Sequence, residues 1–210
     1  MIFSICFLLL FGSCTSTEPK TFIAEKPLEI DSSEFRVIKR EFGYEYKETS
    51  TVWLGGLMPK LPFVEVHSLD LKRKCMWRSK GMIMTCNSMV VKSHGTLVLI
   101  DTEEKFREIF APIDSEQEAV SYVAYLTRTY PKYDIEKKLR YRTFISHFPS
   151  TYARQVEDGY EVLLHDKKVF GCGPHPNFYS LFKVSKAGYI DLLQTVKMFE
   201  DPKEDALCVD

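Results

Sequence analysis

The 210-residue sequence lacks the short motifs that mark the common enzyme classes. It contains no P-loop, no G-x-G-x-x-G turn, no G-x-S-x-G elbow and no H-E-x-x-H pair. The histidines are dispersed rather than paired at helical spacing: His67, His94, His147, His165 and His175. These absences remove the usual signs of a nucleotide-binding protein, a serine hydrolase or a zinc protease, and no motif decides whether the chain is an enzyme.

The chain also lacks an excess of charge of one sign. It has 28 Lys and Arg residues against 29 Asp and Glu residues, which gives a formal net charge of -1. Such a balance supplies no long-range field to attract phosphates, so binding of nucleic acid is disfavoured. The 45% of hydrophobic residues and 27% of charged residues are typical of a folded domain, and the length suits one domain.

Long apolar runs are absent except at the N-terminus, where Ile2 to Phe11 form an almost unbroken apolar stretch. A run of about ten residues fits the core of a signal peptide and is too short to span a bilayer as a helix. No other stretch approaches the length of a transmembrane segment, so no transmembrane helix is expected.

The segment Leu10-Phe11-Gly12-Ser13-Cys14 resembles the lipobox of bacterial lipoproteins. The resemblance implies that diacylglycerol is attached to the Cys14 thiol and that the chain is cut immediately before it. We therefore expect a signal peptide over residues 1–13 and a lipidated cysteine with a polar, flexible tether over residues 14–30. The membrane, through this lipid anchor, is then a partner, and the cell envelope is the location.

An ordinary secretory signal peptide, cut near Ser13 or Ser16, is the alternative, with a secreted or periplasmic product. Residues 31–210 are expected to form a single α+β domain. Their sequence, with Phe110-Ala111-Pro112-Ile113 before a capped helix and Asp158-Gly159-Tyr160 before a Phe-Gly-Cys loop, resembles uncharacterised exported bacterial proteins. This second resemblance implies no activity.

Four cysteines remain outside Cys6 and Cys14: Cys75, Cys86, Cys172 and Cys208. An even number in an exported chain predicts a disulfide framework. Four cysteines allow three pairings, of which we favour two bonds. A bond between Cys75 and Cys86 closes a short hairpin, and a bond between Cys172 and Cys208 pins the C-terminal tail.

The loop Gly171–Pro176 permits other interpretations, because Cys172 and His175 have C-x-x-H spacing and His165 lies seven residues before Cys172. A structural zinc site needs four ligands, and no second pair exists. Catalytic Cys/His pairs are usually distant in sequence. We favour a turn that holds a disulfide, and expect no metal and no cofactor. An envelope hydrolase or thiol enzyme with its site near Cys172 and His175 is the alternative function.

Two consecutive helices are predicted after Asp101. Thr102 and the acidic residues that follow it are typical of a helix start, and apolar residues recur with helical spacing up to Ile113. Ser115 and Glu118 form a capping box for the second helix, which ends before Pro131.

Strands are predicted on both sides of the helices from runs rich in aromatic and β-branched residues, at 35–46, 63–71, 82–84, 89–91, 96–100, 152–156, 160–164, 178–184 and 189–196. Turns are predicted at Asn87-Ser88, His94-Gly95 and Asp158-Gly159. The resulting fold class is α+β, an antiparallel sheet with the two helices packed on one face and a C-terminal β-meander.

Two basic runs, Lys72–Lys80 and Lys137–Arg142, contain Trp77 and Tyr141. Such runs contact anionic lipid head groups or glycans, or are solvated edges that discourage aggregation. From these features we predict a non-enzymatic binding or interaction domain at the cell envelope, whose partner is a protein, a glycan or a small ligand.

Overall fold

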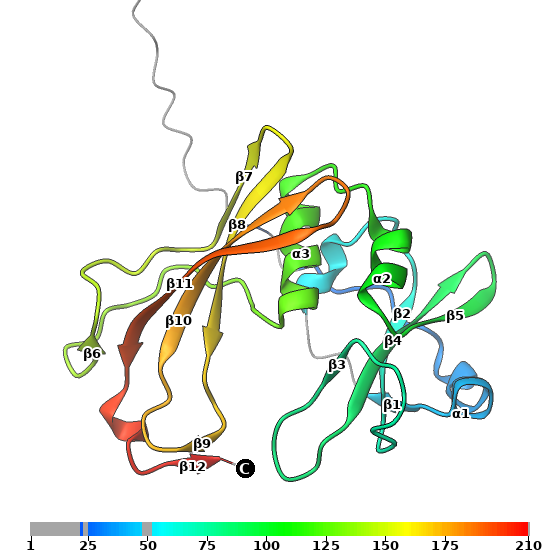
Figure 1. Cartoon of the computed structure of the whole chain (residues 1–210), viewed down its shortest axis with the longest axis horizontal. Coiled ribbons are helices and arrows are strands. Elements are labelled where there is room, and N and C mark those ends of the chain that lie inside the picture. The colour runs from blue at the N-terminus through cyan, green and yellow to red at the C-terminus, as the bar shows by residue number, and fades with distance from the viewer. Residues whose placement is uncertain (1–21, 23–24, 48–51, 210) are drawn as a thin grey trace, which may run out of the picture.

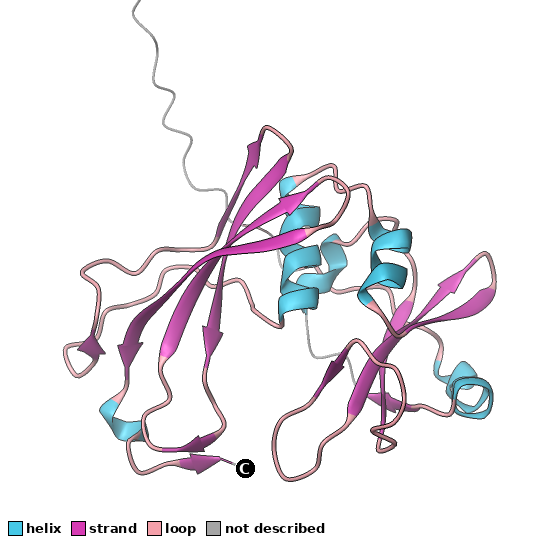
Figure 2. Cartoon of the chain, viewed as in Figure 1, coloured by secondary structure: helices cyan, strands magenta, loops and turns pink. Residues whose placement is uncertain are grey.

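The computed structural model describes residues 22, 25–47 and 52–209. The predicted signal peptide, Cys14 and most of the predicted tether lie outside the described residues. The described chain has the predicted α+β class, with antiparallel sheets and a C-terminal strand meander (Figure 1). The strands before the helices and the strands after them form two separate sheets, and helices α2 and α3 lie between these sheets (Figure 2).

The first sheet is built around strand β4, which pairs antiparallel with three other strands. Its members are β1 (Glu45–Lys47), β2 (Phe63–Ser68), β3 (Trp77–Arg78), β4 (Cys86–Ser93) and β5 (Thr96–Ile100). The predicted strands near residues 63 and 96 are therefore confirmed, as is the turn at His94-Gly95. Residues 86–91 of β4 are buried, which fits a central strand that is covered on both faces.

The strand predicted over residues 35–46 is wrong for most of its length, because Phe35–Phe42 form helix α1. A 3-10 turn capped by the Asp31 carboxylate precedes the helix. Gly43 ends it in the left-handed conformation, with φ 66° and its N–H donating to the Lys39 carbonyl. Phe35, Ile38 and Phe42 are spaced by three and four residues, so they lie on one face of a helix whose other residues are mostly charged. Within the predicted range only the residues of β1 are extended.

Two further predictions in the first sheet are wrong. Residues 82–84 form an exposed loop rather than a strand, and β4 runs without a break through the turn predicted at Asn87-Ser88. Both polar residues are fully buried and their backbones take part in strand pairing, but the Asn87 side-chain oxygen has no hydrogen-bond partner among the described residues. Asn87 donates its amide to the Thr85 carbonyl, and the Ser88 hydroxyl donates to the Tyr44 hydroxyl.

The second sheet contains the two predicted C-terminal hairpins in the order β6-β11-β10-β8-β7. Its strands are β6 (Arg142–Thr143), β7 (Tyr152–Val156), β8 (Gly159–Lys167), β10 (Asn177–Ser185) and β11 (Ile190–Glu200). Strand β6 pairs with β11 only at Phe199 and Glu200, so the rest of the outer edge of β11 has no strand neighbour among the described residues. The register between β10 and β11 shifts twice, between Asn177 and Phe178 and between Leu181 and Phe182.

A third, two-stranded sheet joins β9 (Gly171–Cys172) to β12 (Cys208–Val209). Cys172 and Cys208 are opposite each other in this sheet and form a disulfide, and Cys75 and Cys86 form another. This is the pairing favoured from the sequence. Two disulfides indicate an oxidising, extracytoplasmic location for the folded chain.

Helices α2 (Glu103–Phe110) and α3 (Glu116–Thr127) begin at the predicted caps. The Thr102 hydroxyl accepts a hydrogen bond from the Lys105 amide, and the Ser115 hydroxyl accepts one from the Glu118 amide. The Glu118 carboxylate in turn accepts from the Asp114 amide. One core cluster contains apolar side chains from both helices and from both large sheets, so the helices hold the two sheets together.

Candidate functional site

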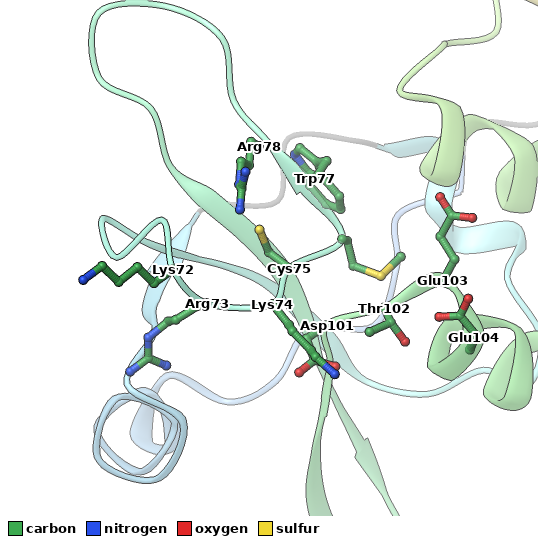
Figure 3. Close-up of a pocket in the computed structure, with 11 residues that line it drawn as sticks. Lys72, Arg73, Lys74, Cys75, Trp77, Arg78, Asp101, Thr102, Glu103 and Glu104 are labelled. Atoms are coloured by element: carbon green, nitrogen blue, oxygen red, sulfur yellow. The ribbon is translucent and has the colours of Figure 1, made fainter.

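A cleft of about 490 Å³ lies between the first sheet and the start of helix α2. Residues 72–78, from the β2–β3 connection and β3, form one wall, and residues 101–104 form the other (Figure 3). Its volume is in the range of small-ligand sites. The first wall is the first basic run of the sequence. The second wall consists of residues that the sequence identified only as a helix start.

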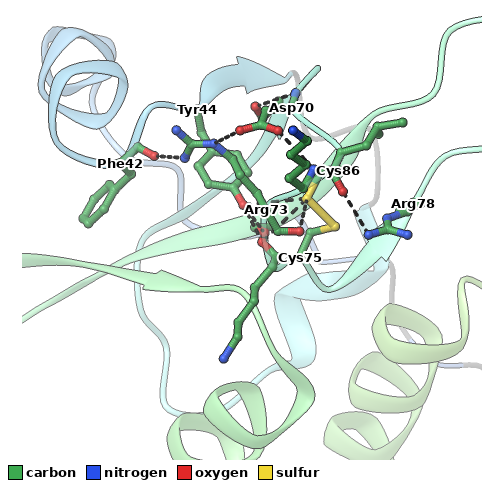
Figure 4. A network of polar contacts seen from close by, with 12 residues as sticks. Phe42, Tyr44, Asp70, Arg73, Cys75, Arg78 and Cys86 are labelled. Carbon is green, nitrogen blue, oxygen red and sulfur yellow. Dashed lines mark hydrogen bonds and ion pairs between the residues drawn. A yellow bond between two sulfur atoms is a disulfide. The ribbon is translucent and has the colours of Figure 1, made fainter.

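The basic wall is held in place by contacts behind it (Figure 4). The Cys75–Cys86 disulfide ties the wall to β4, with the two Cα atoms 5.5 Å apart. The Tyr44 hydroxyl donates to the Lys74 carbonyl at 2.7 Å. Arg73 donates to the Phe42 carbonyl and forms an ion pair with Asp70 at 3.6 Å, so its guanidinium is used to fix the loop.

The remaining cations of this wall are less engaged than Arg73. Lys72, Lys74 and Arg78 are exposed, and none forms an ion pair with another residue in the described part of the chain. The guanidinium of Arg78 donates only to the Leu71 carbonyl. In Figure 3 the Lys74 ammonium is directed toward Asp101 at the opposite wall. These cations are therefore available to a bound ligand.

The opposite wall carries the carboxylates of Glu103 and Glu104 in the first turn of α2. The backbone N–H of Glu104 and the Thr102 hydroxyl hydrogen-bond to the Glu104 carboxylate and lower its pKa, and the charges of Arg107 and Lys74 lower it further. Glu104 is therefore ionised at neutral pH. The cleft presents cations on one side and anions on the other.

Trp77 forms the inner part of the basic wall and is fixed by two contacts. The Arg128 guanidinium carbon lies 4.0 Å from the centre of the indole ring, and the Tyr125 ring meets the indole edge-on at 5.2 Å. Arg128 also forms an ion pair with Glu65 at 3.0 Å, and the Glu65 side chain is only 2% exposed. The cleft wall is thus connected to an ion pair between the partly exposed Arg128 at the end of α3 and the buried Glu65 of β2.

The second basic run differs from the first, because internal ion pairs occupy its arginines. Arg140 binds Asp201 through two nitrogens and lowers the pKa of that carboxyl to about 2. Arg142 pairs with Asp205 and Glu200. This run connects the loop before β6 to the C-terminal segment and is not a free basic surface.

The loop around Cys172 has a structural role. The Cys172 sulfur is bonded to Cys208, so it is not a free thiol nucleophile in this structure. His175 is buried, and its two ring nitrogens lie 3.0 and 3.2 Å from the carbonyl oxygens of Lys168 and Leu207. Among the described residues, no group of three or more His, Cys, Asp and Glu side chains is placed to hold a metal.

His165 is a separate, buried residue of β8, 1% exposed, whose backbone pairs with Tyr130. Burial, with the nearby charge of Lys132, lowers its pKa from 6.5 to about 4. In the unfolded chain the imidazole is protonated first as the pH falls. The stability that depends on the neutral ring is therefore complete above pH 6.5 and is lost as the pH falls toward 4.

We expect the free energy of unfolding to fall by about 2 kcal/mol between pH 7.5 and pH 5 because of this histidine. Urea denaturation at the two pH values measures the loss. His165→Gln, which does not titrate, should show a smaller pH dependence in the same range. Equal pH dependence of the two proteins would show that His165 is not responsible.

A second cavity of about 380 Å³ lies between the two helices and β11. Arg107 covers the Tyr189 ring at 4.3 Å at its side, and Leu126, Phe182 and Leu192 contribute apolar surface. Glu103 lines both this cavity and the cleft. Arg107 is already engaged with the Tyr189 ring, whereas Lys72 and Lys74 of the cleft form no ion pair with a described residue, so the cleft is the stronger candidate site.

Comparison with known proteins gives no match to a family model, to a curated protein or to a solved structure. The helices in the described residues are all too short or too polar to cross a bilayer.

Proposed function

We propose that the chain is an exported cell-envelope protein, anchored by lipid on Cys14, whose folded part is a non-enzymatic binding domain. The observation that carries the binding role is the cleft, where Lys74 and Trp77 lie opposite Glu103 and Glu104. A ligand with separated positive and negative groups complements both walls. Short peptides have this chemistry, so we propose a peptide or an extended segment of an envelope protein as the ligand.

A sugar ring is a poorer fit to the same cleft. Binding of sugars through aromatic residues requires an open ring face, and Arg128 covers one face of the Trp77 indole. The opposed charges also require counter-charges, which neutral glycans lack. These contacts support a charged peptide over a neutral glycan.

The cleft chemistry supports binding rather than catalysis. A general acid or base works best with a pKa near the working pH, whereas the pKa of Glu104 is lowered. The cleft cysteine, Cys75, is bonded to Cys86 and is no nucleophile. Lysine and carboxylate groups in such an environment serve as fixed charges for recognition.

Titration of the full chain with tripeptides that carry Lys and Glu tests the cleft, with the change in tryptophan fluorescence, to which Trp53 and Trp77 contribute, as the signal. Lys74→Gln and Glu104→Gln should each weaken binding about tenfold, because each removes one charge-assisted contact. Lys186→Gln and Glu157→Gln are the controls, since both residues are exposed and lie in the turns of the C-terminal hairpins. Equal binding by cleft variants and controls, or no binding of charged peptides, would reject the proposed site.

The lipid anchor is tested separately by mass spectrometry of the protein from its native host. The expected result is a chain that begins at Cys14 and carries added fatty-acyl mass. An intact Met1 without added mass would reject the anchor but would leave the cleft untested, so the two parts of the proposal fail independently.

A further inference from the structure

The register of the first sheet brings two loops to the same end of the molecule. Cys86, the first residue of β4, is paired with Ser68 of β2 on one side and with Arg78 of β3 on the other. The connections 69–76 and 79–85 therefore leave the sheet side by side, and Figure 1 shows the β3–β4 loop projecting from this end. We call residues 80–84 of this loop the tip.

The tip exposes three consecutive large apolar side chains. Met82, Ile83 and Met84 are 82%, 70% and 51% exposed. Single exposed apolar residues are ordinary, whereas a contiguous apolar group on a surface marks a site of interaction with a protein or a membrane. The sequence pattern suggested a strand here, but no partner strand covers these residues in the described chain.

The neck of the loop keeps the tip projecting. The Ser79 amide donates to the Thr85 carbonyl at 2.9 Å, and the Thr85 amide donates to the Ser79 hydroxyl at 2.8 Å. Immediately below, the Cys75–Cys86 disulfide joins the loop base to the preceding connection. These bonds already fix the base of the loop. The tip therefore loses little additional conformational entropy when it binds a partner.

Exposed cations lie on the two connections that leave this end of the sheet, with Lys80 in the tip itself and Arg78 in the neck of the loop. Lys72, Lys74, Arg78 and Lys80 are exposed, and no ion pair with a described residue neutralises any of them. The chain as a whole has a net charge of -1, so this concentration of cations is local. Asp70, the nearest carboxylate of the same connection, is engaged by Arg73.

We propose that the tip inserts into the surface of an anionic phospholipid bilayer. Met82, Ile83 and Met84 enter the boundary between head groups and acyl chains, while Lys72, Arg78 and Lys80 contact lipid phosphates. An apolar group with a basic rim is the pattern of interfacial membrane binding. The charge complementarity favours an anionic bilayer over an apolar protein surface, which offers no counter-charge. The contact is separate from the peptide in the cleft and from the lipid on Cys14.

The test compares binding of the full chain to phosphatidylcholine vesicles with binding to vesicles that also contain about one third phosphatidylglycerol. We expect preference for the anionic vesicles and loss of this preference in high salt, because salt screens exposed charges. Lys72→Gln with Lys80→Gln should lower the partition coefficient about 25-fold, or about fivefold per charge. Met82→Gln, Ile83→Gln and Met84→Gln together should lower it at least tenfold.

The matched control replaces three exposed leucines away from the tip, Leu139→Gln, Leu192→Gln and Leu193→Gln. Its partition coefficient should equal that of the wild-type chain. Because the N-terminal segment is the same in every variant, differences among them report on the tip alone. Near-ultraviolet circular dichroism of each variant checks that the fold is retained.

Ile83→Trp supplies a local measurement, because brominated phospholipids quench a tryptophan that enters the bilayer. We expect quenching beyond that of the wild-type chain on anionic vesicles and none on neutral vesicles. Equal quenching of the two proteins, or equal partition of the tip variant and the leucine control, would overturn the proposal. Glu104→Gln, which tests the peptide site, should not weaken vesicle binding, so failure of one proposal is distinguishable from failure of the other.

Discussion

Replacement of Cys172 and Cys208 by serine is expected to lower the free energy of unfolding by about 4 kcal/mol. The bond joins residues 36 apart, and a loop of that length loses much conformational entropy in the unfolded chain when it is closed. Strands β9 and β12 contribute only two residues each, and both cysteines of the bond are exposed. The other contacts of this tail are the short β9–β12 pairing, the contact between the Leu207 carbonyl and the His175 ring, and the Arg142–Asp205 ion pair, so we expect residues 205–209 to open more often.

Urea denaturation in the absence of reductant measures this loss, and hydrogen exchange should show that amides of β12 lose protection first. Cys75→Ser with Cys86→Ser is the comparison, because its bond closes a separation of only 11 residues and should contribute about 3 kcal/mol. A loss below 1 kcal/mol on removal of the longer loop would contradict the expectation. The shorter bond has a second effect, because it supports the basic wall of the cleft.

Arg128→Met is expected to destabilise the protein by about 1 to 2 kcal/mol, because the Glu65 carboxylate loses its ion pair with Arg128. The guanidinium contacts Glu65, whose side chain is almost fully buried, and covers the Trp77 ring. Methionine preserves part of the packing but none of the charge. The same change should alter the tryptophan fluorescence spectrum, since Trp77 loses the cation over its face. Thermal or urea unfolding provides the measurement.

Two further variants separate the contributions of Arg128. Its φ is 59°, a left-handed conformation that favours glycine, so Arg128→Gly should be about 1 kcal/mol more stable than Arg128→Met. Combining Glu65→Gln with Arg128→Met should cost less than the sum of the two single changes, because either change alone already removes the ion pair between the two residues. Additive effects would show that the ion pair does not contribute to stability.

Local signals in the sequence predicted the elements whose stabilisation is local. Thr102 and Ser115 cap helices because their hydroxyls meet amides three residues later, and that relation is visible in one short segment. The hairpin turn at Asp158-Gly159 could also be predicted, because its signal lies in adjacent residues. Helix α1 was missed because its four apolar residues, two aromatic and two β-branched, are also typical of a strand, and its decisive signal, Gly43 as a left-handed cap, lies at its end.

The cleft was beyond sequence reasoning for a different reason. Its walls are residues 72–78 and 101–104, and they meet only because β4 and β5 run antiparallel between them. The basic run was recognised, but its opposition to Glu104 depends on this pairing. The disulfide pairing, in contrast, could be favoured from the sequence. One bond closes a short hairpin, and the other fixes the C-terminal tail to the loop near Cys172.

The outer edge of β11 has a consequence for behaviour at high concentration. Leu192 and Leu193 are exposed on a strand whose edge is covered only at its far end. A regular strand of this composition would allow a second copy of the chain to pair with its exposed edge through backbone hydrogen bonds. The irregular register near Leu181 disturbs the spacing of backbone donors and acceptors, so a second chain finds a continuous match over only a few residues. We therefore expect these register shifts to weaken edge-to-edge pairing between copies of the chain that lie close together.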